Sequence, residues 1–474
     1  MSRSVSISVR GVLPVAGWLV AACARTTQPA ADPAPGAAVT GVAITGVSIV
    51  DVQTGRIDAG RTVVVRGNRI VSISPAGTRT PPATQIVRGD GTYLIPGLWD
   101  MHTHSASAAA RELPLHLSFG VTGIRNMHTT VDTALQLVAA IRRAVTAGTI
   151  TGPRFVANGA TVDGPRPAQQ GSVTIGGPEH ARRVVDSLVA GGAEFVKVYN
   201  LLPRETYFAV VDAAKATGMP LVGHVPFTVR AEEAAAAGQR SIEHFDGLDF
   251  SCSSRGEALR SAFLARPSRE AWHATTDSLT ASWSASSCAP AIAAFARHRT
   301  WQVPTLAVAW GDAASDSVLS DSAAVRLVSP RALEAWRGMA GEASEGYRRL
   351  ARARFDNAVA TLRLVHAAGI PILAGTDVGN PFVVPGWSLH RELELLVEAG
   401  LSPLEALQAA TLNPARFLEA TDSLGTVAVG KLGDLVLLDG NPLTDIRQTQ
   451  RIRGVMVNGR YFDRAALDAL RVIR

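Results

Sequence analysis

Short apolar segments alternate with alanine-rich helical stretches over a long central part of the chain, residues 97–420. Strands separated by helices pair in parallel, because a parallel connection needs a crossover of a dozen or more residues. The candidate strands are residues 98–102, 121–127, 154–158, 195–199, 221–225, 241–245, 303–308 and 370–377. This alternation predicts an α/β fold in which the region forms a (β/α)8 TIM barrel. A doubly wound open sheet would alternate similarly, but no glycine-rich phosphate-binding loop follows the first strand.

Both flanks of this region carry a different pattern. Residues 41–96 and 421–474 contain short β-branched segments with period-two alternation, punctuated by glycines, such as 62–65 and 435–438. Segments of this kind are typical of a small sheet. We therefore predict a β-sandwich domain formed by both termini, beside the barrel domain.

Titratable side chains occur where the predicted strands end. His102 and His104 close the first strand, and residues two apart in an extended chain point the same way, so both imidazoles can address one metal ion. Later strands place these further groups at their ends: Lys197, His224, His244 and Asp377. A barrel assembles its site at the carboxyl ends of its strands, so we expect these residues to form one site.

The spacing of these residues fits the barrel repeat. Lys197 follows His102 by 95 residues, or three repeats of roughly 30 residues each, and the next two steps are 27 and 20 residues. The step from His244 to Asp377 is 133 residues, which predicts an insertion of roughly 70 residues. We place this insertion around residues 246–300 and expect it to cover the site.

The N-terminal segment predicts export. Residues 1–22 combine basic and apolar stretches too short to span a bilayer, which is typical of a signal peptide. The small residues before Cys23 resemble the lipobox of bacterial lipoproteins, which implies that Cys23 is a lipid anchor in the cell envelope or periplasm and that residues 23–40 form a tether. The alternative is an ordinary signal peptide. Cys252 and Cys288 pair in an oxidising compartment or stay free.

Composition argues against a nucleic-acid partner. The formal net charge is +6, yet the arginines are scattered and no run of five or six like charges occurs. The sequence also contains no zinc-knuckle, RNP-like or helix-turn-helix signature. We therefore expect a small-molecule or peptide substrate, and the sequence does not predict an oligomeric state.

The ordered set of strand-end residues resembles the amidohydrolase superfamily. That family has a His-x-His after the first strand, a lysine on the fourth, histidines on the fifth and sixth, and an aspartate on the eighth. The segment Gly-Thr-Val-Ala-Val-Gly-Lys-Leu-Gly-Asp-Leu-Val-Leu-Leu at 425–438 is also typical of it. The resemblance covers nearly the whole chain after residue 40.

Two divalent ions and a modified lysine are implied by this resemblance. A lysine enclosed by neutral histidines should have a depressed pKa or be chemically changed, and the family carboxylates it with carbon dioxide. The carbamate on Lys197 would bridge the two ions. His102 and His104 with Asp377 would bind the buried ion, and His224 with His244 the more exposed one. Zinc is the expected metal, although manganese, cobalt and iron accept the same ligand types.

The same resemblance implies hydrolysis. A hydroxide formed from a water shared by the two ions would attack an amide carbonyl, and Asp377 would pass its proton to the leaving nitrogen. His128 and Tyr199 are candidate substrate contacts, and His128 matches a catalytic histidine of similar enzymes. Arg125 could pair with an acidic substrate or with a core carboxylate such as Glu243.

The substrate class rests on three strand motifs. Gly-Val-Thr-Gly-Ile-Arg at 120–125, Phe-Val-Lys-Val at 195–198 and Ile-Glu-His-Phe at 242–245 resemble the imidazolonepropionase-related group, which includes Xaa-Pro dipeptidases. This implies a dipeptidase- or carboxypeptidase-like enzyme acting on peptides or N-acyl amino acids. One alternative is a cyclic amidohydrolase of the imidazolonepropionase or dihydroorotase type. Another is a lipoprotein whose barrel binds ligands without catalysis.

Overall fold

The computed structural model describes residues 41–79, 84–129 and 134–472. The predicted signal peptide, the tether and Cys23 lie outside these ranges. Among the helices of the described ranges, none combines the length and the apolar composition of a membrane-spanning segment.

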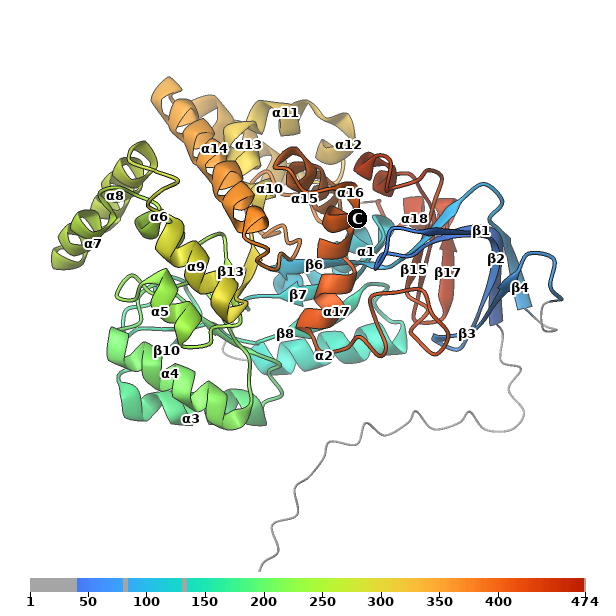
Figure 1. The fold of residues 1–474 in the computed structure, drawn as a ribbon, viewed down its shortest axis with the longest axis horizontal. Coiled ribbons are helices and arrows are strands. Elements are labelled where there is room, and N and C mark those ends of the chain that lie inside the picture. The colour runs from blue at the N-terminus through green and yellow to red at the C-terminus, as the bar shows by residue number, and fades with distance from the viewer. Residues whose placement is uncertain (1–40, 80–83, 130–133, 473–474) are drawn as a thin grey trace, which may run out of the picture. The chain divides into compact units, whose positions relative to one another are not determined.

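Strands from both ends of the chain form one sheet, drawn in blue and red in Figure 1. In spatial order, seven of its strands are β17 (Arg460–Asp463), β16 (Ile452–Val457), β15 (Leu435–Leu438), β5 (Tyr93–Pro96), β1 (Gly41–Val50), β2 (Ile57–Arg66) and β3 (Arg69–Pro75). The eighth strand, β4 (Thr84–Arg88), pairs with β1. The antiparallel pairing of Leu94 with Leu437 joins the two terminal segments.

This sheet curls back on itself around its own core. Ile70 N donates a hydrogen bond to Lys431 O at 2.8 Å, which ties β3 to the segment before β15. Inside, Val63, Leu94 and Leu437 are at most 1% exposed and pack in one apolar cluster. The predicted strand-rich domain formed by both termini is therefore present, built as one continuous curled sheet.

Parallel strands build the second part of the structure, as predicted. They are β6 (Leu98–Thr103), β7 (Val121–Asn126), β8 (Arg154–Ala157), β9 (Val162–Asp163), β10 (Val173–Thr174), β11 (Val196–Val198), β12 (Leu221–Gly223), β13 (Ser241–Glu243) and β14 (Trp301–Val303). β6, β7 and β8 form one parallel sheet, and β9 to β14 form the other. The TIM-barrel-like α/β fold is therefore confirmed.

The last two predicted strands differ from the structure. The seventh is Trp301–Val303 rather than 303–308, because Pro304 cannot donate to a ladder and Thr305 takes a left-handed φ of 48° before a helix starts. The eighth, 370–377, forms no ladder: Ile372 makes an isolated bridge to Gln302, and the bridge to Thr103 lies one residue beyond the predicted strand, at Val378. It still closes the ring, because Leu373 N donates to Gln302 O and Met101 N donates to Ala374 O, each at 2.9 Å.

Helices follow the barrel strands and cover them. The principal ones are α1 (Ala109–Ser118), α2 (Ala134–Ala147), α3 (Pro178–Ala190), α4 (Arg204–Thr217), α5 (Ala231–Ala236), α9 (Ala289–His298), α14 (Glu345–Ala367) and α15 (Trp387–Glu398). In α2, Val138, Ile141 and Val145 recur at helical spacing and are buried. Shorter helices are η1 (Ser105–Ala108), α16 (Pro403–Ala409), α17 (Leu412–Phe417), η2 (Ile446–Gln450) and α18 (Arg464–Ala469).

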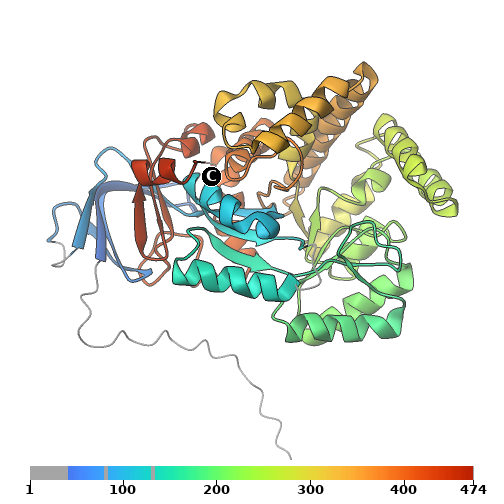
Figure 2. The same ribbon diagram turned by 180° about the vertical axis from the view of Figure 1, so that it is seen from behind.

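Extra helices occupy two places. After β13 come α6 (Leu248–Ser251) and a hairpin of α7 (Gly256–Ala265) and α8 (Arg269–Ala281), within the region predicted as an insertion. After β14 come α10 (Leu306–Ala313), α11 (Ser315–Ser320), α12 (Ser322–Val325) and α13 (Pro330–Glu342), which lie outside the predicted insertion. Both views show the α7–α8 hairpin beside the long helix α14 (Figure 1, Figure 2).

A disulfide closes the base of this hairpin. Cys252 and Cys288 are bonded, which decides between the two alternatives left open by the sequence. Backbone hydrogen bonds reinforce the closure, from Ser254 N to Ser282 O at 2.9 Å and from Ser284 N to Cys252 O at 2.6 Å. The hairpin therefore starts and ends at one fixed point.

Candidate metal centre

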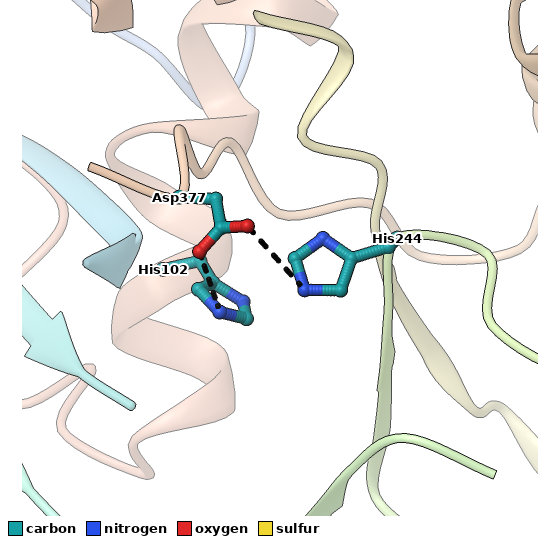
Figure 3. Close-up of side chains that lie close together, drawn as sticks. All are labelled: His102, His244 and Asp377. Atoms are coloured by element: carbon teal, nitrogen blue, oxygen red, sulfur yellow. Dashed lines mark ion pairs between the residues drawn. The ribbon is translucent and has the colours of Figure 1, made fainter. Parts of the chain in front are cut away.

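The carboxyl ends of the barrel strands bring three predicted metal ligands together. His102 lies at the end of β6, His244 directly follows β13, and Asp377 ends the segment that closes the barrel. Figure 3 shows the two imidazoles facing the carboxylate. Asp377 Oδ1 is 3.4 Å from His102 Nε2, and Asp377 Oδ2 is 3.8 Å from His244 Nε2.

These side chains fit a metal ion. One donor atom from each of His102, His244 and Asp377 lies within 4.8 Å of the others. His102 Nε2 is buried and has no hydrogen-bond partner among the described residues. Buried polar atoms are rarely left unpaired, and imidazole nitrogen with carboxylate oxygen is the donor set that zinc and similar ions accept. An ion bound here would satisfy this nitrogen.

Two of these residues hold an uncommon backbone conformation. His244 and Asp377 each have a φ of 59°, in the left-handed region that non-glycine residues seldom adopt. Such conformations cost about 1–3 kcal/mol each and cluster at functional sites, where neighbouring structure enforces them. At Asp377 the enforcing contact is a hydrogen bond from its backbone N to His102 O, at 2.7 Å.

His104 joins the cluster from the position directly after β6. Its Nε2 lies 2.9 Å from Asp377 Oδ1. Burial alone would raise the pKa of Asp377, but His244, His102 and His104 around it hold that pKa well below its ordinary value. Asp377 is therefore an anion placed among three imidazoles, as a shared ligand would be.

A buried network orients His102. Its Nδ1 lies 2.9 Å from Glu243 Oε2, and Arg125 donates to both oxygens of Glu243 at 2.9 and 3.0 Å. Burial, together with neighbouring cations, lowers the pKa of His102 well below its ordinary value, so the ring is neutral. Nδ1–H then donates to Glu243, and Nε2 keeps its lone pair for a ligand. Of the two partners considered for Arg125, the structure selects Glu243.

Lys197 lies in the middle of β11 and lines one cavity together with His104, His244 and Asp377. Its side chain is 1% exposed, and burial lowers the pKa of its amine to about 8. Gly223 on the neighbouring strand β12 allows this close packing. A Cβ there would lie 2.4 Å from Val198 O and 3.0 Å from Lys197 Cγ.

The other two predicted ligands are each held by a second side chain. His224 Nδ1 lies 3.2 Å from Asp246 Oδ2, and its ring centroid is 5.1 Å from that of His244. His244 Nδ1 lies 2.7 Å from the hydroxyl of Thr305, which directs its Nε2 toward Asp377. The predicted ligand sets place His244 with His224 at the second ion, whereas in the structure His244 also lies next to two ligands of the first.

A cavity of about 390 Å³ opens over this cluster and contains both predicted substrate contacts. His128 packs with its ring 6.2 Å from that of His104, and its Nε2 lies 3.2 Å from the carbonyl of Gln170. Burial lowers the pKa of His128 to about 4. Tyr199 lies 4.1 Å from the ring of His224, and burial raises the pKa of its phenol, which therefore keeps its proton.

Four residues that position the cluster are not among the predicted site residues. Glu243 orients His102 as well as pairing with Arg125, Asp246 holds His224, and Thr305 holds His244. Asp100 accepts from Thr376 Oγ1 at 2.6 Å and so ties the segment before Asp377 to β6. Acidic residues one or two positions away from a predicted ligand histidine, as in Glu-His and Asp-x-His, were the available signal.

The fold and these donor atoms define a parallel-barrel protein whose strand ends could hold a metal ion. The sequence profile of the Amidohydrolase family matches residues 93–461. The chain belongs to the amidohydrolase family.

Several solved structures share this fold over most of the chain. A bottromycin amidohydrolase is 26% identical with a TM-score of 0.69, covering 91% of this chain and 90% of its own. A candidate prolidase of Bifidobacterium longum is 26% identical with a TM-score of 0.66, covering 91% and 98%. A Xaa-Pro dipeptidase with bound methionine is 20% identical with a TM-score of 0.65, covering 90% and 100%, and shows the fold alone.

Curated relatives match over short segments. An imidazolonepropionase of Geobacillus sp. (strain WCH70) is 37% identical over 81 residues, which is 17% of this chain and 19% of that protein. Adenine deaminase 2 of Jannaschia sp. (strain CCS1) is 46% identical over 58 residues, 12% of this chain and 9% of that protein. The chain therefore covers less than a fifth of the length of either relative.

Proposed function

We propose that this protein is a metal-dependent hydrolase that cleaves an amide bond, in the manner of a dipeptidase or carboxypeptidase. The observation that carries the proposal is the cluster of His102, His244 and Asp377, whose ligand atoms lie within 4.8 Å of one another beside the buried amine of Lys197. Membership of the amidohydrolase family supports the reaction class.

Two divalent ions would be held by the six strand-end residues. His102, His104 and Asp377 would hold the first, His224 and His244 the second, and a carboxylated Lys197 would supply further oxygen ligands. Neutral Lys197 amine would add to the carbon of carbon dioxide and release one proton, leaving a carbamate anion in a pocket lined by histidines. Bound ions, with zinc the expected metal, would supply Lewis-acid polarisation of the substrate carbonyl and a lower pKa for an attacking water.

The chain's own residues would position the substrate and move its protons. Asp377, held as an anion by three histidines, would accept a proton from the attacking water and deliver it to the leaving nitrogen. Protonated Tyr199 and neutral His128 face the same cavity, where each could donate a hydrogen bond to a carbonyl or carboxylate oxygen. His128 would exchange its bond to Gln170 for one to substrate.

Peptides and N-acyl amino acids are the substrate class we favour. The structural similarity to a candidate prolidase over nearly the full length of both chains supports this choice. A cyclic amide is the second candidate, favoured by the local sequence match to an imidazolonepropionase.

Metal content and turnover test the proposal together. The purified protein should carry about two divalent ions per chain and release amine from a panel of dipeptides, N-acyl amino acids and cyclic amides. Asp377→Asn and Lys197→Ala should each lower turnover by at least about 100-fold. Lys215→Ala is the matched control, because this exposed lysine lies on α4. Near-full turnover in either site variant, or no metal in an active enzyme, would contradict the mechanism.

We further propose that the protein is exported and anchored through lipid on Cys23. Support comes from the disulfide between Cys252 and Cys288, since such bonds persist mainly in oxidising compartments. Expression with radiolabelled fatty acid should label the wild-type chain and leave Cys23→Ser unlabelled. Equal labelling of both chains, or of neither, would contradict the anchor.

A further inference from the structure

A second cavity, of about 340 Å³, shares His244 with the cavity of the candidate metal centre. Its walls come from the disulfide-closed hairpin and from the helix α14 beside it. Two tryptophans, Trp272 and Trp283, line it together with Thr361 and Asn357. The first cavity is lined mainly by polar side chains, whereas the second combines polar side chains with two indole rings, and the two cavities meet at one proposed metal ligand.

Both tryptophan rings are held in place before any ligand arrives. Trp272 packs in an aromatic cluster, with its centroid 4.6 Å from that of Phe227 and 5.4 Å from that of Phe263. Trp283 donates from its indole N–H to Thr361 Oγ1 at 3.3 Å. Each tryptophan is only half-buried, so part of its surface stays available. Fixed aromatic surfaces bind a ring at a small cost in conformational entropy.

The backbone under Trp283 is also fixed. Ser253 and Trp283 form an isolated antiparallel bridge, and the disulfide between Cys252 and Cys288 lies on either side of it in sequence. Asn357 on α14 donates to Thr280 O on α8 at 3.0 Å, so the far wall is tied to the hairpin. The two walls lie side by side in Figure 1 and Figure 2.

Charge in this cavity disfavours an anion. Arg354 is the one arginine among the lining residues, and it is paired with Asp277 Oδ1 at 2.9 Å and bonded to the hydroxyl of Thr276. Asp249 also lines the cavity, and burial raises the pKa of its carboxyl to about 7, so it adds no positive charge that an anion could use. A substrate carboxylate would therefore be placed better in the other cavity, beside His128 and Tyr199.

We propose that the Trp272–Trp283 cavity is a specificity pocket that receives an aromatic side chain of the substrate. This deepens the proposed function, on which it rests: the scissile amide would lie at the metal centre, a ring in this pocket, and the polar end of the substrate in the first cavity. The preferred substrates are then peptides or N-acyl amino acids that carry an aromatic side chain next to the cleaved bond.

Binding can be measured without any hydrolysis. L-Phenylalaninol and L-alaninol differ by one ring and contain no amide, so calorimetric titration of the zinc-loaded full chain isolates the pocket. Wild type should bind L-phenylalaninol about tenfold or more tightly than L-alaninol. Equal affinity for the two probes would overturn the proposal.

Variants locate the binding. Trp283→Ala and Trp272→Ala should each reduce the preference for L-phenylalaninol to less than about threefold. Trp387→Ala is the matched control, because Trp387 is half-buried at the start of α15 and does not line this cavity. Ala358→Phe fills the cavity without removing a tryptophan, and should abolish the preference even where a tryptophan variant fails to fold. An unchanged preference in Ala358→Phe would overturn the proposal.

Kinetics separate this proposal from the proposed function. In an active enzyme, replacing alanine by phenylalanine beside the cleaved bond should lower KM or raise kcat/KM by about tenfold, and Trp283→Ala should remove this gain. Turnover without any aromatic preference would contradict the specificity pocket but not the proposed hydrolase activity. Selective binding of L-phenylalaninol with no turnover of any amide would contradict the proposed hydrolase activity and support the specificity pocket.

Discussion

Glu243 Oε2 lies 2.9 Å from Nδ1 of His102, and both side chains are fully buried. A buried carboxylate is stable only when it is paired, and Arg125 supplies the balancing charge through two hydrogen bonds. The contact with Glu243 places the proton of His102 on Nδ1. The unprotonated nitrogen, Nε2, therefore faces Asp377.

Glu243→Gln should weaken the metal centre and the fold together. The amide leaves Arg125 as a buried cation without a counter-charge, which costs about 3–5 kcal/mol of unfolding free energy. Loss of the orienting carboxylate should lower metal affinity by about 10- to 100-fold. Metal titration and urea unfolding measure the two effects. Glu194→Gln is the control, since its pair with Arg142 is partly exposed, and comparable losses there would contradict the argument.

Gly223→Ala should displace Lys197. The new methyl group would lie 2.4 Å from Val198 O and 3.0 Å from Lys197 Cγ, and the φ of 117° already disfavours any side chain. We expect about 1–3 kcal/mol of destabilisation and a marked loss of bound metal. Gly218→Ala is the matched control, because its φ of 68° is also left-handed while no atom lies within 4 Å of its Cβ. Equal metal content in the two variants would contradict the clash.

Glu392→Gln should change how stability depends on pH. Burial raises the pKa of Glu392 to about 8 from the ordinary value of 4.5. The folded chain therefore holds this proton more tightly than the unfolded chain. The contribution of Glu392 to the free energy of unfolding is greatest below its ordinary pKa and falls as pH rises toward 8. A glutamine stays neutral, so the variant should gain a few kcal/mol relative to wild type between pH 5 and pH 8.

Urea unfolding at both pH values measures this gain for Glu392→Gln. Glu398→Gln on the same helix is the control, because its carboxylate is 56% exposed and pairs with Arg391. A constant difference between Glu392→Gln and wild type across this range would show that Glu392 titrates normally. Glu392 accepts a hydrogen bond from Ala307 N at 2.7 Å, so the variant also tests the start of α10.

Removal of the disulfide should loosen the hairpin. Cys252 and Cys288 are 36 residues apart, and closing a loop of that length stabilises a fold by about 4 kcal/mol in the chain-entropy description. The double substitution Cys252→Ser with Cys288→Ser should lower the unfolding temperature and weaken L-phenylalaninol binding. A reductant should shift the unfolding temperature of wild type and leave that of the double variant unchanged. An equal response of both proteins would contradict a structural role for the bond.

Much of the fold could be predicted because each repeat of the barrel has its own local sequence pattern. Short apolar segments and helical stretches alternate at regular spacing, so six of the predicted strands, from 98–102 to 241–245, match observed ones closely. The prediction failed at 303–308 and 370–377, where Pro304 and a left-handed Asp377 interrupt pairing. The helices at 306–342 were also not predicted as additions to the barrel. Amphipathic periodicity indicates that a helix forms, but it does not indicate where in the fold the helix packs.

Candidate ligands could be named from the sequence because each lies at or near the end of a predicted strand. The carboxyl ends of parallel strands lie at the same face of the barrel. His102, His104, Lys197, His224, His244 and Asp377 were found in this way. Their supporting partners could not be, since Glu243 pairs with Arg125 from 118 residues away and Thr305 reaches His244 across 61. Such contacts depend on packing geometry, which leaves no periodic signal.

By itself the sequence determined an α/β barrel flanked by a domain from both termini, the amidohydrolase resemblance and the order of the strand-end ligands, because these follow from local periodicity and residue type. Only the tertiary structure decided that Cys252 bonds Cys288, that Arg125 serves Glu243, and that Trp272 and Trp283 enclose a second cavity. Those relationships join residues far apart in the chain, and burial and hydrogen-bond geometry choose among partners that the sequence leaves equivalent.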